Sequence, residues 1–381
     1  MSSVEEFRTE VRSWLRAHLS GEFADLKGRG GPGREHEAFT ERLAWERQMA
    51  AHGWTCVGWP KEYGGRGASI EEQIAFHEEY ALADAPARVN HIGEQLLGPT
   101  LIAYGTEEQK RRFLPPIAAV EELWCQGYSE PDAGSDLANV RTRAALDGDR
   151  WVINGQKIWT SLAHESQWCF VVARTEAGSR RHAGLSYLLV PMDQRGVEVR
   201  PIVQLTGTSE FNEVFFDDAT TDAAHVVGAV GDGWRIAMAT LGFERGVSTL
   251  GQQVGFRREW EALAATARSN GAIGDPLIRD RLVRAWTGLE TMRALAVNGA
   301  DPSVAKLYWS HWHRDLGELA MDVCGAASTL ATGAHGEPYE LDDWQRLFLF
   351  SRADTIYAGS SEIQRNIIAE RVLGLPKEVR A

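Results

Sequence analysis

The sequence predicts an α+β protein of several domains, in which a β-rich middle part separates two helical parts. Three observations predict this order. Residues 1–120 carry apolar side chains at helical spacing, residues 121–231 hold short β-branched segments between turn residues, and residues 232–381 return to long amphipathic segments with capping signals. We therefore predict an N-terminal helical domain, a middle antiparallel β-barrel domain and a C-terminal helical domain with these boundaries.

The N-terminal part opens with a predicted helix over residues 4–19. Its apolar residues recur every three or four positions, at Val4, Phe7, Val11, Trp14, Leu15 and Leu19. Further helices are expected over 39–52, 69–83 and 92–104. Thr106 to Gln109 has the pattern of a capping box, so another helix should begin there.

The middle part reads as strands that alternate in polarity or are rich in β-branched residues. The predicted strands cover residues 124–128, 169–174, 185–191, 197–203 and 213–217. Asp147-Gly148 and Asn154-Gly155 are dipeptides typical of two-residue hairpin turns, so two tight hairpins are expected there. A partly closed antiparallel barrel is the simplest packing of these strands.

The last part is helical again. Amphipathic segments cover residues 233–267, 277–297, 341–356 and 361–373. Asp301-Pro302 combines an N-cap residue with proline at the first helical position, which predicts a helix from there through Val323.

Composition narrows the class of protein. The 381 residues carry a formal net charge of −13, which disfavours non-specific binding to nucleic acid. Mean hydropathy is −0.30, and no apolar run is long enough to span a bilayer. The acidic N-terminus lacks the apolar core of a signal peptide, so a cytosolic location is expected. The four cysteines are widely spaced, which predicts free, mostly buried thiols and no zinc cluster.

Two motifs in the middle part carry the chemistry. Residues 129–136 read Ser-Glu-Pro-Asp-Ala-Gly-Ser-Asp, where small residues leave backbone N–H and hydroxyl groups accessible, and residues 157–161 read Lys-Ile-Trp-Thr-Ser. This pair, at this spacing, resembles the flavin-binding β-domain of the acyl-CoA dehydrogenase family. The resemblance covers nearly the whole chain. It implies the same helical, β, helical architecture, with a four-helix bundle as the C-terminal domain.

The resemblance also implies a reaction and a set of contacts. Family members remove a proton from the α-carbon of an acyl-CoA thioester and pass a hydride from the β-carbon to FAD, and an electron-transfer flavoprotein takes the electrons. Flavin contacts are expected from Gln126, Tyr128, Ser129, Trp159, Thr160, Ser161, Ser360 and Glu362. Substrate contacts are expected from Ser135, Arg245, Tyr357, Ala358 and Gly359. Three of these have plainer interpretations: Trp159 as a core aromatic, Ser135 as a turn residue and Arg245 as an ion-pair partner.

The catalytic base is expected to be Glu244. Many relatives carry the base in a Tyr-Glu-Gly-Thr motif, but this chain has Ala358 at that position. Other relatives place it in a Leu-x-x-Glu-Arg motif, which Leu241 to Arg245 matches here. The N–H of Ala358 is then a candidate donor to the thioester oxygen. Glu362 is the rival base, but it lies four residues past the loop position and is expected to cap the last helix.

Two further motifs depart from the family. In homotetrameric relatives, two motifs, Arg-x-x-Phe-Gly and Gln-x-x-Gly-Gly-x-Gly, bind the diphosphate of the FAD held by a neighbouring subunit. Here Arg268 remains without the Phe, and Asp322 replaces the Gln. An Asp would repel a pyrophosphate. Either a second acyl-CoA dehydrogenase-like chain supplies the grip in an α2β2 heterotetramer, as in a subfamily that shortens steroid side chains, or the chain is a divergent homotetramer.

Other functions remain open at this point. The same fold could serve an oxygen-using flavoprotein, or a non-catalytic subunit that completes a partner's site, although the presence of Glu244 argues against the second. Gly242 beside the base suggests room for a bulky or branched acyl group.

Overall fold

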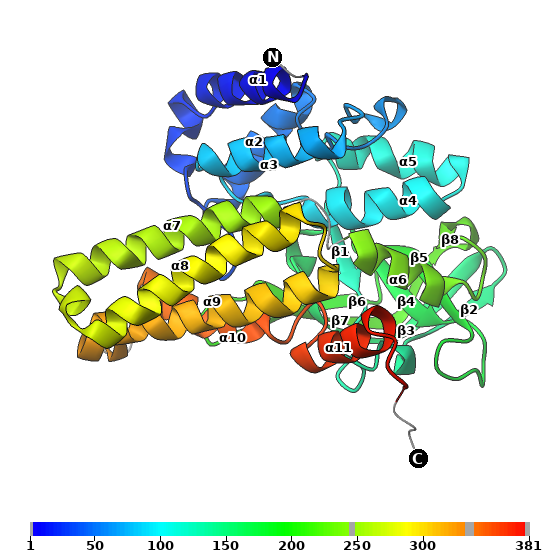
Figure 1. The fold of residues 1–381 in the computed structure, drawn as a ribbon. Coiled ribbons are helices and arrows are strands. Elements are labelled where there is room, and N and C mark those ends of the chain that lie inside the picture. The colour runs from blue at the N-terminus through cyan, green and yellow to red at the C-terminus, as the bar shows by residue number, and fades with distance from the viewer. Residues whose placement is uncertain (1–2, 244–247, 332–338, 378–381) are drawn as a thin grey trace. The chain divides into compact units, whose positions relative to one another are not determined.

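A computed structural model describes residues 3–243, 248–331 and 339–377 (Figure 1). Glu244 and Arg245, the predicted base and its neighbour, lie outside the described residues. Every helix within these ranges is too short or too polar to cross a membrane.

Contacts along the chain define two units. The first comprises Met1–Val203 and Thr208–Gly246, and the second comprises Gln204–Gly207 and Val247–Ala381. The predicted boundaries near residues 120 and 231 stay a prediction.

The first unit begins with the predicted helices. They are α1 (Ser3–His18), α2 (Phe39–Ala51), α3 (Ile70–Leu82), α4 (Gly98–Tyr104) and α5 (Glu107–Ala118). The segment predicted as one helix over 92–104 instead starts as a π-helical turn, Gly93–Leu97, before α4. The predicted capping box is confirmed: Gln109 N donates to Thr106 Oγ1 at 3.2 Å, and Thr106 N donates to the Gln109 side chain at 3.0 Å.

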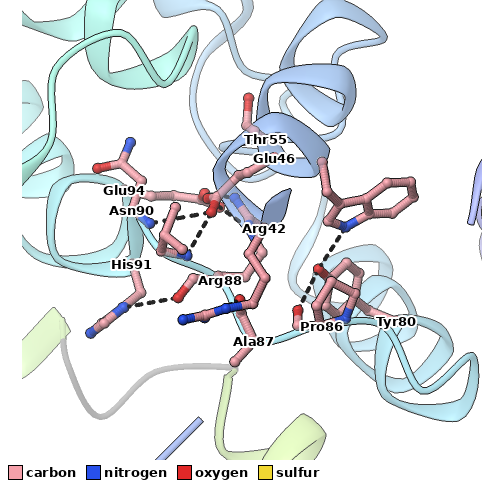
Figure 2. Close-up of polar contacts among 12 residues, drawn as sticks. Arg42, Glu46, Thr55, Tyr80, Pro86, Ala87, Arg88, Asn90, His91 and Glu94 are labelled. Carbon is pink, nitrogen blue, oxygen red and sulfur yellow. Dashed lines mark hydrogen bonds and ion pairs between the residues drawn. The ribbon is translucent and has the colours of Figure 1, made fainter. Parts of the chain in front are cut away.

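A buried polar network fixes the connection between α3 and the π-helical turn (Figure 2). The Arg88 guanidinium lies between two carboxylates: it donates to Glu46 at 2.7 Å and also to Glu94. Glu46 on α2 accepts a further hydrogen bond from Val89 N at 2.6 Å. Nearby, the Tyr80 hydroxyl on α3 donates to Pro86 O at 2.7 Å. Because each buried charge has an opposite partner, the network holds this connection against α2.

The middle of the first unit is one mostly antiparallel sheet. Its strands are β1 (Trp124–Gly127), β2 (Arg143–Asp147), β3 (Arg150–Ser161), β4 (Trp168–Arg174), β5 (Leu185–Pro191), β6 (Val197–Ile202), β7 (Phe211–Asp222) and β8 (Val226–Val227). They follow the order β6-β7-β3-β2-β4-β5-β8, and β1 pairs with β4. The β1–β4 pairing is parallel, which departs from the purely antiparallel prediction. Helix α6 (Gly233–Phe243) packs on β5.

One of the two predicted hairpins is correct. β2 and β3 are joined by a two-residue turn at Gly148-Asp149, one residue later than predicted, with Asp147 paired to Arg150. The second is wrong: β3 continues through Asn154-Gly155 as a bulged strand paired with β7. Asn154 bonds across the strands to Asp218, with its Nδ2 donating to the carboxylate at 2.8 Å. A Cβ on Gly155 would lie 2.5 Å from Thr142 Oγ1, so glycine is needed here for close approach rather than for a turn.

The second unit is helical. Its helices are α7 (Ser248–Ser269), α8 (Pro276–Val297), α9 (Pro302–Cys324), α10 (Asp343–Asp354) and α11 (Ser361–Ile367), followed by a π-helical turn, Ile368–Val372. Helices α7, α8 and α9 run alongside one another, and α10 packs on α9 (Figure 1). The predicted cap is confirmed, because Ser303 N donates to Asp301 Oδ1 at 2.8 Å. The predicted segment over 233–267 corresponds to α6 and α7.

The cysteines are as predicted. All four are free thiols; Cys56, Cys125 and Cys169 are buried and Cys324 is half-buried.

Candidate active site

The two sequence motifs of the first unit lie side by side. Ile158 N on β3 donates to Ser129 O at 2.9 Å. Within the first motif, Glu130 and Ala133 exchange backbone hydrogen bonds of 3.1 and 3.0 Å, which closes a tight loop directly after β1. The end of β1, this loop and β3 therefore form one surface.

A buried ion pair between Lys157 and Glu130 links the two motifs. Lys157 is fully buried, and its Nζ donates to Glu130 Oε1 at 2.8 Å, to Tyr128 O at 3.0 Å and to Val172 O at 2.8 Å. Glu130 also accepts hydrogen bonds from the backbone N–H of Arg141 at 2.6 Å and of Thr142 at 2.9 Å. All three ammonium donors have acceptors, so the charge is satisfied inside the sheet.

The electrostatics of the pair follow from burial and attraction. Burial alone would raise the pKa of Glu130, but Lys157 and the N–H donors bring it below its ordinary value. Burial lowers the pKa of Lys157 more than Glu130 raises it. Sequence reasoning missed this pair, although both residues stand inside the recognised motifs.

Trp159 points away from the core. The β3–β7 register shifts between Lys157 and Thr160, and within this bulge Trp159 has a φ of +59°. Its side chain is 56% exposed, with the Phe211 ring edge-on at a centroid distance of 6.1 Å. The interpretation of Trp159 as a core aromatic is therefore wrong. A large exposed aromatic on a bulge is available to pack on a flat ligand.

Two polar atoms on the same strands support a ligand site. Gln126 Nε2 and Thr160 Oγ1 are buried, and neither has a hydrogen-bond partner among the described residues. Buried polar groups normally have partners, so a polar ligand is a physical reason for such atoms. Gln126 on β1 and Thr160 on β3, the residue after Trp159, are therefore candidate contacts for a polar ligand.

The remaining predicted residues of the first unit have different environments. Tyr128 is a core residue, with its ring edge-on to Phe170 and Tyr187 at 5.8 and 6.2 Å. Ser161 is half-buried and pairs with Phe211 across β3 and β7. Ser135 is exposed on the loop before residues 137–139.

In the second unit, the predicted substrate segment is a tight turn between α10 and α11. Ser361 N donates to Thr355 O at 2.9 Å, which closes the turn. The Gln364 side-chain amide donates to the carbonyls of Ala358 and Gly359 at 3.2 Å each. Ala358 has a φ of +51°, a conformation that a non-glycine residue adopts only when its surroundings impose it.

The last helix is capped by Ser360 and not by Glu362. The Ser360 side chain accepts from Ile363 N at 3.4 Å. Glu362 is exposed in the first turn of α11, with Arg365 3.8 Å away. The Ser360 hydroxyl, one residue after Gly359, is therefore the N-cap group of α11.

Another ionic cluster, centred on the buried His313 and Asp354, contacts this turn through Tyr357. His313 on α9 contacts Asp354 through Nδ1 at 2.5 Å and Glu259 on α7 through Nε2 at 3.0 Å. The other oxygen of Asp354 accepts from the Tyr357 hydroxyl at 2.5 Å. Lys306 Nζ donates to the Asp354 carbonyl at 2.6 Å. Sequence reasoning missed this arrangement, because its members are far apart in the chain.

The cluster predicts a pH dependence of stability. Burial lowers the pKa of His313, but Glu259 and Asp354 raise it more, to about 10. An imidazole in the unfolded chain titrates near pH ~6.5. The folded state therefore binds the proton more tightly, and its contribution is complete below about pH 6.5 and lost as the pH rises towards about 10.

Urea titrations across this pH range check the prediction. We expect the wild-type free energy of unfolding to fall more steeply with pH than that of His313→Gln. The difference in slope should be at most about 1.4 kcal/mol for each pH unit, the value for one bound proton. Parallel pH profiles of the two proteins would contradict this.

The two altered motifs of the second unit also lie together. The Asn270 side chain, after α7, donates to Val323 O near the end of α9 at 2.8 Å. Asp322 is paired with Arg281 on α8, and Arg268 is exposed in the last turn of α7. The two altered motifs, far apart in the chain, thus form one surface. Its acidic residue, Asp322, is already paired with Arg281.

Comparison with known families extends these observations. Models of the acyl-CoA dehydrogenase N-terminal, middle and C-terminal domains match residues 2–121, 125–219 and 231–373. The chain is 67% identical over 390 residues to acyl-CoA dehydrogenase IpdE1 of Mycobacterium tuberculosis and 65% identical over 397 residues to IpdE1 of Mycolicibacterium smegmatis, in both cases over 100% of each chain.

Solved structures also match the chain over nearly its whole length. The Tcur3481–Tcur3483 steroid ACAD matches with a TM-score of 0.83 and 31% identity, over 99% of each chain. The ChsE4–ChsE5 complex from Mycobacterium tuberculosis matches with a TM-score of 0.81 and 30% identity, over 100% of this chain and 99% of that one.

Proposed function

Because the chain belongs to the acyl-CoA dehydrogenase family, we propose that it dehydrogenates an acyl-CoA thioester to the trans-2-enoyl-CoA, with Glu244 as the base. The observation that carries the proposal is the surface made by the end of β1 and residues 129–136 and 157–161. It presents the exposed Trp159, and two buried polar atoms, Gln126 Nε2 and Thr160 Oγ1, lack a partner among the described residues.

The residues of the first unit fit FAD as the cofactor. Gln126, Ser129, Thr160 and Ser161 would hold the polar edge of the flavin ring, and Trp159 would pack on the ring. Backbone groups near Tyr128, at the end of β1, would also contact the flavin ring. Ser360 and Glu362 are the proposed contacts from the second unit. FAD supplies the acceptor for the β-hydride when it is bound.

This chain's own groups remove the α-proton and donate a hydrogen bond to the thioester oxygen. The Glu244 carboxylate takes the α-proton, and the N–H of Ala358 donates to the thioester oxygen as negative charge develops there. Gln364 holds the carbonyls of Ala358 and Gly359, so the turn is already fixed before substrate arrives. Ser135 and Arg245 are proposed contacts for the CoA portion.

The acyl group is proposed to be bulky and ring-bearing, with a steroid-derived group as the leading candidate. Support comes from the steroid ACAD among the matching structures and from Gly242 beside the base. We further propose an α2β2 heterotetramer with a second acyl-CoA dehydrogenase-like chain. It is supported by the Asp322 substitution and by the likeness to a two-component complex, ChsE4–ChsE5. An electron-transfer flavoprotein is the proposed acceptor.

The test of the function is anaerobic mixing of the FAD-loaded complex with ring-bearing and straight-chain acyl-CoAs. Bleaching of the oxidised flavin, with trans-2-enoyl-CoA as the product, is expected. If every acyl-CoA leaves the flavin oxidised, the proposed reaction is wrong. Rapid reoxidation of the reduced complex by air would instead favour an oxygen-using enzyme.

A further inference from the structure

The turn that carries Ala358 is attached to a chain of ionic groups running across three helices. Glu259 on α7, His313 on α9 and Asp354 at the end of α10 follow one another at 3.0 and 2.5 Å, and the chain ends on the Tyr357 hydroxyl at 2.5 Å. Asp354 and His313 are buried, whereas Glu259 is partly exposed. The buried carboxylate therefore meets the segment one residue before Ala358.

We propose that Asp354 is a positioning residue, which fixes the Tyr357–Gly359 turn through the Tyr357 hydroxyl. The inference rests on the proposed function, since it concerns how that turn is presented to the thioester. Asp354 is well suited to this task because both of its oxygens are used, one by His313 and one by Tyr357, and its carbonyl accepts from Lys306. The carboxylate therefore cannot rotate without breaking a contact.

The geometry of the turn shows why such an anchor is needed. Ala358 is held at a φ of +51°, which costs free energy for any residue with a Cβ. Gln364 fixes the turn from α11, through the carbonyls of Ala358 and Gly359. Asp354 fixes it from α10, on the other side of Ala358. With both anchors the direction of the Ala358 N–H is defined; with one of them the turn can relax.

The test compares three variants in the FAD-loaded complex. Tyr357→Phe removes only the hydroxyl, and Asp354→Asn removes the charge at the same contact. Tyr339→Phe is the matched control, because the Tyr339 hydroxyl also donates to a protein oxygen, Leu205 O at 2.9 Å, but lies outside the turn. We expect Tyr357→Phe and Asp354→Asn to lower kcat roughly ten- to a hundredfold, with a smaller change in KM, since a misplaced donor is felt most in the transition state. The control should match wild type.

A second readout separates positioning from a merely structural role. A 3-thia acyl-CoA can lose its α-proton but has sulfur in place of the β-carbon, so it cannot donate the hydride. Its ionisation on the enzyme is followed by absorbance against pH. If the turn is misplaced, the pH midpoint of the bound analogue should rise by about one pH unit, the equivalent of a tenfold loss. A merely structural effect would lower the unfolding temperature and leave this midpoint unchanged.

The outcomes decide between the possibilities. Wild-type values of kcat and of the midpoint in Tyr357→Phe would overturn the inference, whatever happens to Asp354→Asn. Should Asp354→Asn fail to fold, Tyr357→Phe alone decides. Failure of the wild-type complex itself to turn over acyl-CoA or to ionise the analogue would instead overturn the proposed function.

Discussion

Replacing Glu244 by Gln is expected to lower kcat by about a hundred- to ten-thousandfold, the contribution usual for a positioned general base. Gln keeps the size of the side chain but cannot accept the α-proton. The measurement is steady-state dehydrogenation by the complex with its partner, at saturating acyl-CoA. FAD content and substrate affinity should change little, because the carboxylate acts in the proton transfer.

Two further variants control this experiment. Glu290→Gln removes an exposed carboxylate on α8 that pairs with Arg257, and it should keep wild-type kcat. Ala358→Glu, added to Glu244→Gln, restores a carboxylate at the position where many relatives carry theirs. Partial recovery of activity would indicate that both positions reach the same α-carbon. Full activity of Glu244→Gln alone would remove Glu244 from the mechanism.

Replacing Lys157 by Met should unfold or strongly destabilise the first unit. The change leaves the buried Glu130 carboxylate without its cation and the carbonyls of Tyr128 and Val172 without their shared donor. Breaking one side of a buried ion pair typically costs about 3–5 kcal/mol. The measurement is urea unfolding followed by tryptophan fluorescence, together with retained FAD, which should fall because Trp159 is two residues away.

The control for this prediction is an exposed pair on the same sheet. Arg200 and Glu198 lie 2.8 Å apart on β6 with both side chains exposed, so Arg200→Met should leave the unfolding midpoint nearly unchanged. The double variant Glu130→Gln/Lys157→Met should be more stable than Lys157→Met, because no unpaired charge remains buried. An unfolding midpoint of Lys157→Met equal to that of Arg200→Met would show that the pair is not structurally important.

Local signals predicted most of the fold, and they failed where a distant partner decides. Apolar spacing and caps located the helices, as at Thr106 and Asp301, because a helix is held by contacts within a few residues. Asn154-Gly155 was misread as a hairpin because the turn signal is local, whereas the pairing of Asn154 with Asp218 is set 64 residues away. The same limit hid the parallel pairing of β1 with β4.

The candidate site divides in a similar way. The resemblance assigned flavin contacts to the loop after β1 and to the end of β3, and the hydrogen bond between Ser129 and Ile158 shows that the two segments are neighbours. Motifs could not reveal the groups that hold these segments in place. Lys157 and Asp354 act through carbonyls and side chains from several elements, and only a folded chain brings those together. The exposure of Trp159 depends on a bulge that the sequence does not mark.

The FAD content of this chain, purified alone and after co-expression with an acyl-CoA dehydrogenase-like chain, is the most direct test of how its flavin site is completed. We propose that this chain holds the flavin ring, and that its partner supplies the diphosphate grip that the altered motifs at Arg268 and Asp322 no longer provide. We therefore expect a folded chain with little FAD when alone, and stable FAD binding, with about two FAD for each α2β2 heterotetramer, in the complex. About one FAD per chain in the protein purified alone would contradict this proposal and establish a homo-oligomer that completes its own sites.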